Sequence, residues 1–350
     1  MTYSVIQWAT GGIGKAAIQG VQSHPELELA GCWVHSPEKA GKDAGEIAGI
    51  GKIGVIATSS IEEILAIEAD CVVYAPLLPN EDEVVQLLES GKSVVTPVGW
   101  VYPFKSVNID RLQAACLKGK SVLHGSGIHP GGITERFPLV LSSLTRAVTH
   151  VRSEEFSDIR TYNAPDVVRE IMLFGKKPQE ALAGPMVLFL ANGFGQSIHM
   201  IADELGFKLD SEIKTINEVA VAISPIASPI GVIEPGLVAA QRFKWQGCVD
   251  GEPVIEAIVN WLMGEGPFDK PWGFGSEGTR FEVEVTGDPT LKAVYHGFHP
   301  ATIESGLIRN EGIVAPAMHC VNAIPYVCQS EPGIRTYLDL PMICGRAAVR

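Results

Sequence analysis

A short glycine-containing turn near the N-terminus constrains the fold of this chain most strongly. The turn Ala9-Thr10-Gly11-Gly12-Ile13-Gly14 follows the apolar run Val5–Trp8 and opens a segment with apolar residues at helical spacing. Strand, glycine turn and helix in this order are the fingerprint of a dinucleotide-binding site. Gly11 would let the backbone approach a pyrophosphate, and Gly14 would let the helix pack closely on the strand. The match is imperfect, because Ala9 stands where the first glycine is expected.

The turn and the start of the following helix predict the phosphate contacts of this site. A helix N-terminus offers N–H groups without intrahelical partners and the positive end of the helix dipole. The predicted phosphate-binding residues are Thr10, Gly11, Gly12, Ile13 and Gly14.

The end of the second predicted strand indicates which nicotinamide cofactor is bound. A site for NAD has Asp or Glu there to bind the ribose 2′-hydroxyl, whereas this chain has His35, Ser36 and Lys39. Ser36 can donate to a 2′-phosphate, Lys39 can neutralise it, and His35 can stack or hydrogen-bond. These residues favour NADP, with NAD as the alternative. The competing interpretation is that Ser36 caps the next helix and Lys39 is solvated.

The first third of the chain alternates predicted strands and helices. Strands are expected at Leu27–Val34, Cys71–Ala75, Lys92–Thr96 and Ser121–His124. This alternation predicts an α/β fold with an open, doubly wound and mostly parallel sheet. Ligands of such sheets bind outside the carboxyl ends of the strands. Pro76 follows one of these ends and is therefore added to the predicted cofactor residues.

The pattern changes after about residue 147. Val238–Cys248 and Pro253–Met263 flank Asp250-Gly251, which is a strong hairpin signal. A second hairpin is expected around Gly287–Thr290. These features predict an α+β region built on an antiparallel or mixed sheet.

The two patterns predict two domains. Residues 1–147 are expected to form a dinucleotide-binding Rossmann domain, and residues 148–311 an α+β domain for substrate binding and dimerisation. The segment 312–350 is small-residue rich and helical in pattern, and we expect it to return to the first domain. A pocket where cofactor and substrate meet is expected where two such domains adjoin.

Composition and charge argue against several classes of function. Hydrophobic residues make up 46% and charged residues 19%, as in a folded globular protein. The net charge of −13 argues against nucleic acid as a partner. No apolar run is expected to reach the ~20 residues that span a bilayer, and the N-terminus lacks a signal-peptide pattern. Seven scattered cysteines indicate reduced thiols in a cytoplasmic protein, and no metal site is expected.

Several motifs in a fixed order resemble those of a known family. They are Val5–Gly14, His35–Lys39, Asp43–Glu46, Gly125–Gly131, Tyr162–Gly175, Val321–Pro325 and Asp339–Pro341. The chain resembles the dihydrodipicolinate reductase-like superfamily, and within it the group of 2,4-diaminopentanoate dehydrogenases and native amine dehydrogenases. The resemblance implies a homodimeric, NAD(P)-dependent enzyme that moves hydride to or from a C–N or C=O carbon. It also implies that Asn322 takes part in cofactor binding.

One departure from the family pattern concerns ammonia. The resemblance implies a glutamate between a Val-Thr pair and a Tyr-Pro pair, but the stretch from Val95-Thr96 to Tyr102-Pro103 contains no carboxylate. Its centre, Gly99-Trp100-Val101, cannot accept a proton from ammonium. The predicted reaction is therefore hydride transfer to a hydrophobic carbonyl, imine or activated alkene. The alternatives are an amine dehydrogenase with a substituted acid, and an NADP-binding sensor or scaffold without catalysis.

Three residues are predicted as the proton donor of this reaction. His129 lies in a glycine-rich turn after a strand, and histidine titrates near neutral pH. Tyr102 lies beside the missing glutamate and could protonate an alkoxide. Glu135 could replace the lost carboxylate. Each has a structural alternative: His129 could pin its turn, Tyr102 could only pack, and Glu135 could stabilise a helix dipole.

The substrate pocket is predicted to be apolar and largely aromatic. The residues proposed to line it are Trp100, Tyr162, Met172, Phe174, Phe194 and His199. Few charged residues share their segments, so a small hydrophobic substrate fits better than a large anion. About half of these side chains are expected to be core instead.

Overall fold

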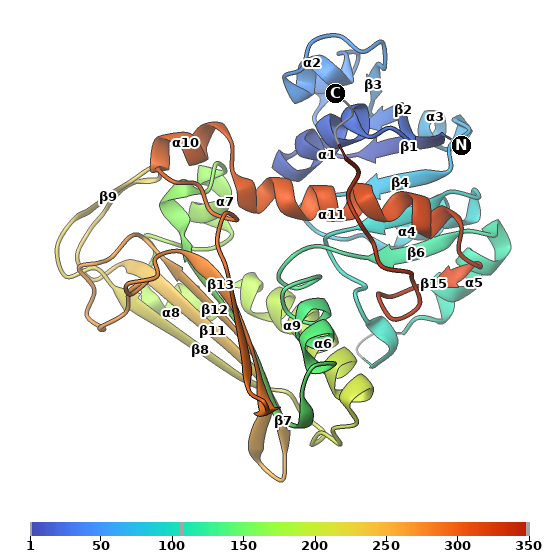
Figure 1. Ribbon diagram of the computed structural model, residues 1–350. Helices are drawn as coiled ribbons and strands as arrows, with labels where there is room; N and C mark the ends of the chain where they lie inside the picture. The colour runs from blue at the N-terminus through green and yellow to red at the C-terminus, as the bar shows by residue number, and fades with distance from the viewer. Residues whose placement is uncertain (1, 106–107, 348–350) are drawn as a thin grey trace. The chain divides into compact units, whose positions relative to one another are not determined.

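The computed structural model describes residues 2–105 and 108–347. The chain forms two compact units, which are unit 1 (Met1–Gly131 with Ile313–Arg350) and unit 2 (Gly132–Gly312). The first boundary lies at Gly131 rather than at residue 147, because helix α6 (Arg136–Ser142) packs against strands of unit 2. Most elements of both units are labelled in Figure 1.

Unit 1 contains a seven-stranded sheet in the order β3-β2-β1-β4-β5-β6-β15, and every neighbouring pair is parallel. The strands are β1 (Tyr3–Trp8), β2 (Leu27–Trp33), β3 (Ala57–Thr58), β4 (Cys71–Tyr74), β5 (Ser93–Thr96), β6 (Val122–Gly125) and β15 (Gly333–Ile334). The helices are α1 (Gly12–Ser23), α2 (Ala44–Ala48), α3 (Ile61–Ala66), α4 (Glu81–Glu89), α5 (Asp110–Gly119) and α11 (Glu311–Cys328), with 3-10 turns η1 (Pro37–Lys39) and η2 (Pro103–Lys105). The predicted doubly wound α/β fold is confirmed. The strand order reverses between β1 and β4, which is where such sheets bind ligands.

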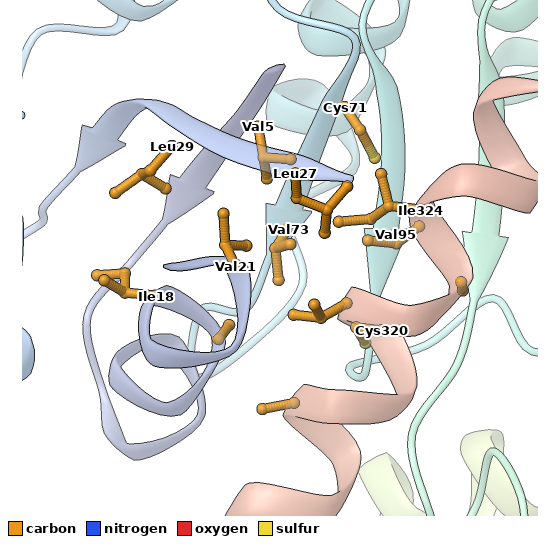
Figure 2. Packing of buried hydrophobic residues seen from close by; sticks show 14 of the residues in the cluster. Val5, Ile18, Val21, Leu27, Leu29, Cys71, Val73, Val95, Cys320 and Ile324 are labelled. Atoms are coloured by element: carbon orange, nitrogen blue, oxygen red, sulfur yellow. The ribbon is translucent and has the colours of Figure 1, made fainter. Parts of the chain in front are cut away.

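The interior strands of unit 1 are apolar because both faces of the sheet are covered. All four residues of β4 are buried, as expected for a parallel strand between helical layers. Figure 2 shows residues of one layer, with Ile18 and Val21 of α1 and Cys320 and Ile324 of α11 near side chains of the strands. The segment after residue 312 contributes α11 to the core of unit 1.

Unit 2 is built on a six-stranded mixed sheet in the order β14-β13-β7-β12-β11-β8. The strands are β7 (Arg146–Asp158), β8 (Lys214–Val221), β11 (Val238–Val249), β12 (Glu252–Leu262), β13 (Arg280–Asp288) and β14 (Leu291–Tyr295), and a separate hairpin is formed by β9 (Ile226–Ser228) and β10 (Gly231–Ile233). The remaining helices are α6, α7 (Pro165–Glu170), α8 (Pro178–Leu182), α9 (Pro185–Leu205) and α10 (Ile303–Ile308), with the 3-10 turn η3 (Ile159–Thr161). β7 and β12 are parallel, while the other neighbouring pairs are antiparallel.

The predicted hairpins of unit 2 are confirmed. Asp250 and Gly251 have φ of 52° and 82° between the paired strands β11 and β12, as a two-residue turn with both φ positive requires. β13 and β14 are also paired across the predicted turn around Gly287–Thr290. Gly206, with φ of 80°, ends α9 in the left-handed conformation.

We expected no segment long and apolar enough to span a bilayer. Judged by length and composition alone, one helical stretch contradicts this expectation. The helical stretch Pro178–Leu205 passes that test, with 44% of its most apolar window buried. Phe194, Ile198 and Ile201 of this stretch pack with Trp245 and other sheet residues in the core of unit 2. That packing is typical of the core helix of a globular unit.

Candidate functional site

The turn between β1 and α1 has the geometry that a phosphate-binding turn requires. Ala9 has φ of 70°, a left-handed conformation that explains why glycine is expected at this position. A Cβ on Gly14 would lie far inside contact distance of the Ala9 carbonyl oxygen, so helix and strand can pack only with glycine there. The Gln7 Nε2 donates to the Trp8 and Ala9 carbonyls at 3.0 and 2.9 Å and holds the turn on the strand.

Gly11 differs from Gly14, because nothing in the protein requires it to be glycine. It is the N-cap of α1 with φ of −69°, which any residue adopts, and an added Cβ would meet no atom within 4 Å. The N-terminus of α1 has no side-chain cap and no acid in its first turn. Its N–H groups and positive dipole end therefore face an open cradle that a Cβ would fill. These residues fit the pyrophosphate of a dinucleotide.

The tip of β2 is joined to this turn through Lys39. The Lys39 Nζ lies 3.3 Å from both the carbonyl oxygen and the Oγ1 of Thr10. Lys39 is half-buried, so it is not the solvated lysine of the competing interpretation. Ser36 precedes η1 but makes no side-chain cap hydrogen bond. The structure thus brings Thr10, Ser36 and Lys39 to one corner of unit 1, and His35 is exposed beside them.

The segment after β5, where the resemblance implied a glutamate, packs closely against the end of β6. Trp100 has φ of 54°, a strained conformation for a large side chain, and it is buried in the core of unit 1. A Cβ on Gly125 would overlap the Trp100 backbone, so the glycine at the end of β6 permits this close approach. Gly99 has φ of 137°, and a Cβ there would point into open space. Tyr102 packs edge-on against Phe104, with 5.2 Å between the ring centroids.

The loop after β6 carries His129 and is held at several points by the C-terminal part of unit 1. The Tyr337 hydroxyl donates to the Gly131 carbonyl at 2.5 Å, and its oxygen lies 2.9 Å from the Ser126 Oγ, which can donate to it. The His319 Nδ1 lies 2.7 Å from the Gly127 carbonyl oxygen, and its ring stacks on Tyr337 at a centroid distance of 5.2 Å. The contacts of His319 with Gly127 and of Tyr337 with Gly131 hold the backbone on both sides of His129.

The other residues predicted for the site lie in unit 2 and in separate packing clusters. Glu135 is fully buried at the N-terminus of α6. Phe174 and Phe194 have no exposed surface, and Phe194 stacks on Trp245 with 4.2 Å between centroids. Met172 and Tyr162 belong with Phe174 to one cluster, while Phe194 belongs to another, and His199 is half-buried on α9. Their part in a substrate pocket stays a prediction, as does the catalytic role of Glu135.

The structure therefore groups the predicted residues of unit 1 around the carboxyl ends of its strands. The phosphate turn, the β2 tip, half-buried Pro76 after β4, Tyr102 after β5 and His129 after β6 all follow strand ends on the same edge of the parallel sheet. Asn322 lies half-buried on α11.

Sequence reasoning missed Gln7, His319 and Tyr337. Gln7 left a signal, because it is a polar residue inside an apolar strand. The other two left none, since they contact a loop about 200 residues away in sequence. Among the residues that the structure describes, no group of three His, Cys, Asp or Glu side chains could hold a metal ion.

Comparisons with known proteins connect this geometry to a family. The sequence profile of the dihydrodipicolinate reductase N-terminus matches residues 5–76, which include the phosphate turn and the β2 tip. The profile of the 2,4-diaminopentanoate dehydrogenase C-terminal domain matches residues 133–348. The structure of an amine dehydrogenase from Mycobacterium smegmatis has the same fold, with a TM-score of 0.76, 19% identity, and coverage of 99% of this chain and 98% of that one.

Two relatives in sequence extend the match. An amine dehydrogenase of Streptomyces virginiae is 32% identical over 354 residues, covering 97% of this chain and 96% of the relative. The 2,4-diaminopentanoate dehydrogenase of Acetoanaerobium sticklandii is 31% identical over 265 residues, covering 74% of this chain and 67% of the relative. The chain is a nicotinamide-dinucleotide-dependent oxidoreductase, and it belongs to the family of 2,4-diaminopentanoate dehydrogenases and amine dehydrogenases.

Proposed function

We propose that this oxidoreductase uses NADP(H) and transfers hydride to the carbon of a small hydrophobic C=O or C=N substrate. The open cradle at Gly11 is the single observation that carries the proposal. A glycine that the protein itself does not need, before a helix N-terminus without a cap, is explained by a bound pyrophosphate. Unit 1 is then the cofactor domain, and the residues assigned to substrate binding lie in unit 2, apart from Trp100.

The preference for NADP rests on the corner formed by Thr10, Ser36 and Lys39. The Lys39 Nζ lies 3.3 Å from Thr10 of the turn, and the Ser36 hydroxyl is not used to cap η1. A 2′-phosphate would receive a charge-assisted hydrogen bond from Lys39. An NAD-type site would instead have a carboxylate at the end of β2.

The bound cofactor supplies the hydride, and the protein must supply the proton. His129 is the favoured donor, because its loop backbone is held by Tyr337 and His319 on both sides. Tyr102, on the next strand end, is the second candidate. The remaining work of the chain is to bind and orient a hydrophobic substrate, to which Trp100, Tyr162, Met172, Phe174, Phe194 and His199 are assigned.

Reductive amination is the second candidate function. The full-length similarity to an amine dehydrogenase favours it. The stretch Gly99-Trp100-Val101 argues against it, because no group there can accept a proton from ammonium. If ammonia is a substrate, Glu135 or another acid has taken over that role.

The test is oxidation of NADPH, and separately of NADH, in the presence of hydrophobic ketones and aldehydes, with and without ammonium. We expect consumption of NADPH that yields the alcohol and does not depend on ammonium. Efficient ammonium-dependent formation of amine would overturn this choice in favour of the second candidate. We further propose that the protein is a cytoplasmic homodimer without membrane or nucleic-acid partners. Size-exclusion chromatography with light scattering would check the dimer.

A further inference from the structure

Unit 2 contains a hydrogen-bonded chain of three polar side chains that the proposed function has not used. Glu155 and Ser157 lie two residues apart on one face of β7, and His299 lies in the segment between β14 and α10. The Ser157 hydroxyl lies 2.5 Å from the Glu155 Oε1 and 2.7 Å from the His299 Nε2. The Trp261 Nε1 donates to the same Glu155 oxygen at 2.9 Å. The serine hydroxyl thus lies between an acid and an imidazole.

The environment keeps the imidazole neutral and lets the acid take up a proton near neutrality. Enclosure of the carboxyl group raises the pKa of Glu155 to about 7, against the lowering effect of its hydrogen bonds from Ser157 and Trp261. Burial lowers the pKa of His299 to about 4. The charged groups that act on His299 are Asp158, which raises that pKa, and His296, which lowers it.

Asp158 is itself paired, and the register partners of Glu155 on the neighbouring strands are uncharged. Asp158 is bound by Arg160 through three hydrogen bonds of 2.6 to 3.1 Å. On the neighbouring strands, Glu155 is paired in register with Phe281 of β13 and Val259 of β12, which carry no charge. The Phe281 ring stacks on His299, with 5.2 Å between the ring centroids.

The donors and acceptors of Glu155, Ser157 and His299 allow two hydrogen-bonding states. When Glu155 is ionised it can only accept, so Ser157 donates to it and the His299 Nε2–H donates to the serine oxygen. The Nδ1 of the neutral imidazole then has no proton. When Glu155 is protonated it can donate to Ser157, which in turn donates to the His299 Nε2. The single proton of the neutral imidazole must then be on Nδ1.

The far end of this hydrogen-bonded series is a buried nitrogen that has no partner in the described part of the chain. The His299 Nδ1 is buried and has no hydrogen-bond partner among the residues that the structure describes. A buried polar atom without a partner is costly and calls for an explanation. A ligand that accepts or donates one hydrogen bond at this nitrogen would satisfy it.

We propose that Glu155, Ser157 and His299 form a proton relay, in which protonation of Glu155 converts the His299 Nδ1 from an acceptor into a donor toward a bound substrate. This rests on the proposed function, since reduction of a C=O or C=N bond needs one proton besides the hydride. The relay and His129 are alternative sources of that proton, and the effect of Glu155→Gln on turnover decides between them. One proton moves from the Glu155 carboxyl to Ser157, one from Ser157 to Nε2, and one leaves Nδ1. The two electrons travel with the hydride, and solvent returns a proton to Glu155.

The first test observes the relay directly, without activity. Nitrogen-15 NMR of histidine-labelled protein reports the tautomer of each ring, and a His299→Gln variant assigns the signal. We expect neutral His299 to switch from the Nδ1–H to the Nε2–H tautomer as pH rises through the Glu155 pKa of about 7. Glu155→Gln and Ser157→Ala should abolish the switch, and Glu154→Gln, on the opposite face of β7, should preserve it. If the tautomer of His299 in the native protein does not change with pH, the proposal is overturned.

The second test connects the relay to turnover. Glu155→Gln should lower kcat by about tenfold or more and remove the limb of the pH–rate profile near the Glu155 pKa of about 7, while NADPH affinity is unchanged. An unchanged pH–rate profile in Glu155→Gln would overturn the assignment to the reaction. If the NMR switch is present but the native protein reduces no hydrophobic carbonyl or imine, the relay stands and the proposed function fails.

Discussion

The two units carry their polar groups in different places. In unit 1 the parallel strands are buried on both faces, so the groups that can meet a ligand lie beyond the strand ends, as at Gly11 and Lys39. In unit 2 polar groups lie along the strands themselves. Glu154 and Glu256 form ion pairs on one face of the sheet, while Glu155 lies on the other. A site at strand ends follows from the order of elements, whereas one on strand faces depends on register between distant segments.

The phosphate turn gives the most direct test of the idea that the ligand site of unit 1 lies at its strand ends. Gly11→Val should weaken NADPH binding by about 100-fold or more, equivalent to about 2.7 kcal/mol, without changing thermal unfolding. Gly14→Val should instead destabilise the fold, because its Cβ would overlap the Ala9 carbonyl. Calorimetric titration and thermal unfolding measure the two effects. If Gly11→Val folds and binds NADPH as tightly as the native protein does, the open cradle is not the cofactor site.

The loop after β6 gives an effect of comparable size, on turnover rather than on cofactor binding. His129→Ala should lower kcat by roughly 10²–10⁴-fold with little change in the dissociation constant of NADPH, because the proton donor is lost and the turn remains. Tyr102→Phe is the matched comparison, and we expect its loss to be smaller. Steady-state kinetics with one reducible substrate measures both. If Tyr102→Phe lowers kcat more than His129→Ala does, Tyr102 and not His129 is the favoured proton donor.

At the β2 tip a side chain of unit 1 should affect selectivity rather than binding as such. Lys39→Ala should weaken NADPH by roughly 1–3 kcal/mol and leave NADH nearly unaffected, since only the 2′-phosphate carries the extra charge. Lys42→Ala, an exposed lysine nearby, is the control and should change neither. Equal losses for both cofactors in Lys39→Ala would remove the NADP assignment.

The smallest effect is expected on the charged face of unit 2. A hydrogen bond from His150, followed by those from Gln246 and the charge of Lys244, lowers the pKa of Glu256 from 4.5 to about 2. A lowered pKa stabilises the fold above the unfolded value, and this contribution is lost as pH falls from 4.5 toward about 2. Glu256→Gln should therefore flatten the fall in stability over that window, by about 1 kcal/mol. Denaturant unfolding at several pH values measures it, and parallel curves for both proteins would contradict it.

The strand ends of unit 1 could be predicted from sequence because local patterns determine them. An apolar run, a glycine turn and a helix place Gly11 and His35 at the same edge of the sheet whatever the rest of the chain does. The details of the turn could not be predicted in the same way. That Ala9 adopts φ of 70° and that Lys39 reaches Thr10 depend on contacts between β1 and the segment after β2.

The clusters of unit 2 could not be predicted, because the alternation of a strand does not say which face is enclosed. Glu154 and Glu155 are adjacent and identical in type, yet one pairs with Arg152 and the other with Ser157 and Trp261. Aromatic residues have the same ambiguity. Phe194 was expected at a pocket because of its segment, and its stacking on Trp245 depends on β11, which follows about 50 residues later.

The return of α11 to unit 1 has a consequence for the order in which the protein is made. Ala317, Cys320, Val321 and Ile324 fill the core against β1, β4 and β5, so the sheet of unit 1 lacks part of one packing layer until α11 has been synthesised. Unit 2 is continuous in sequence and is translated before that helix. Unit 1 therefore begins before unit 2 and is completed after it. The part of its apolar sheet face that α11 covers stays exposed to chaperones or to misassembly while the ribosome makes unit 2.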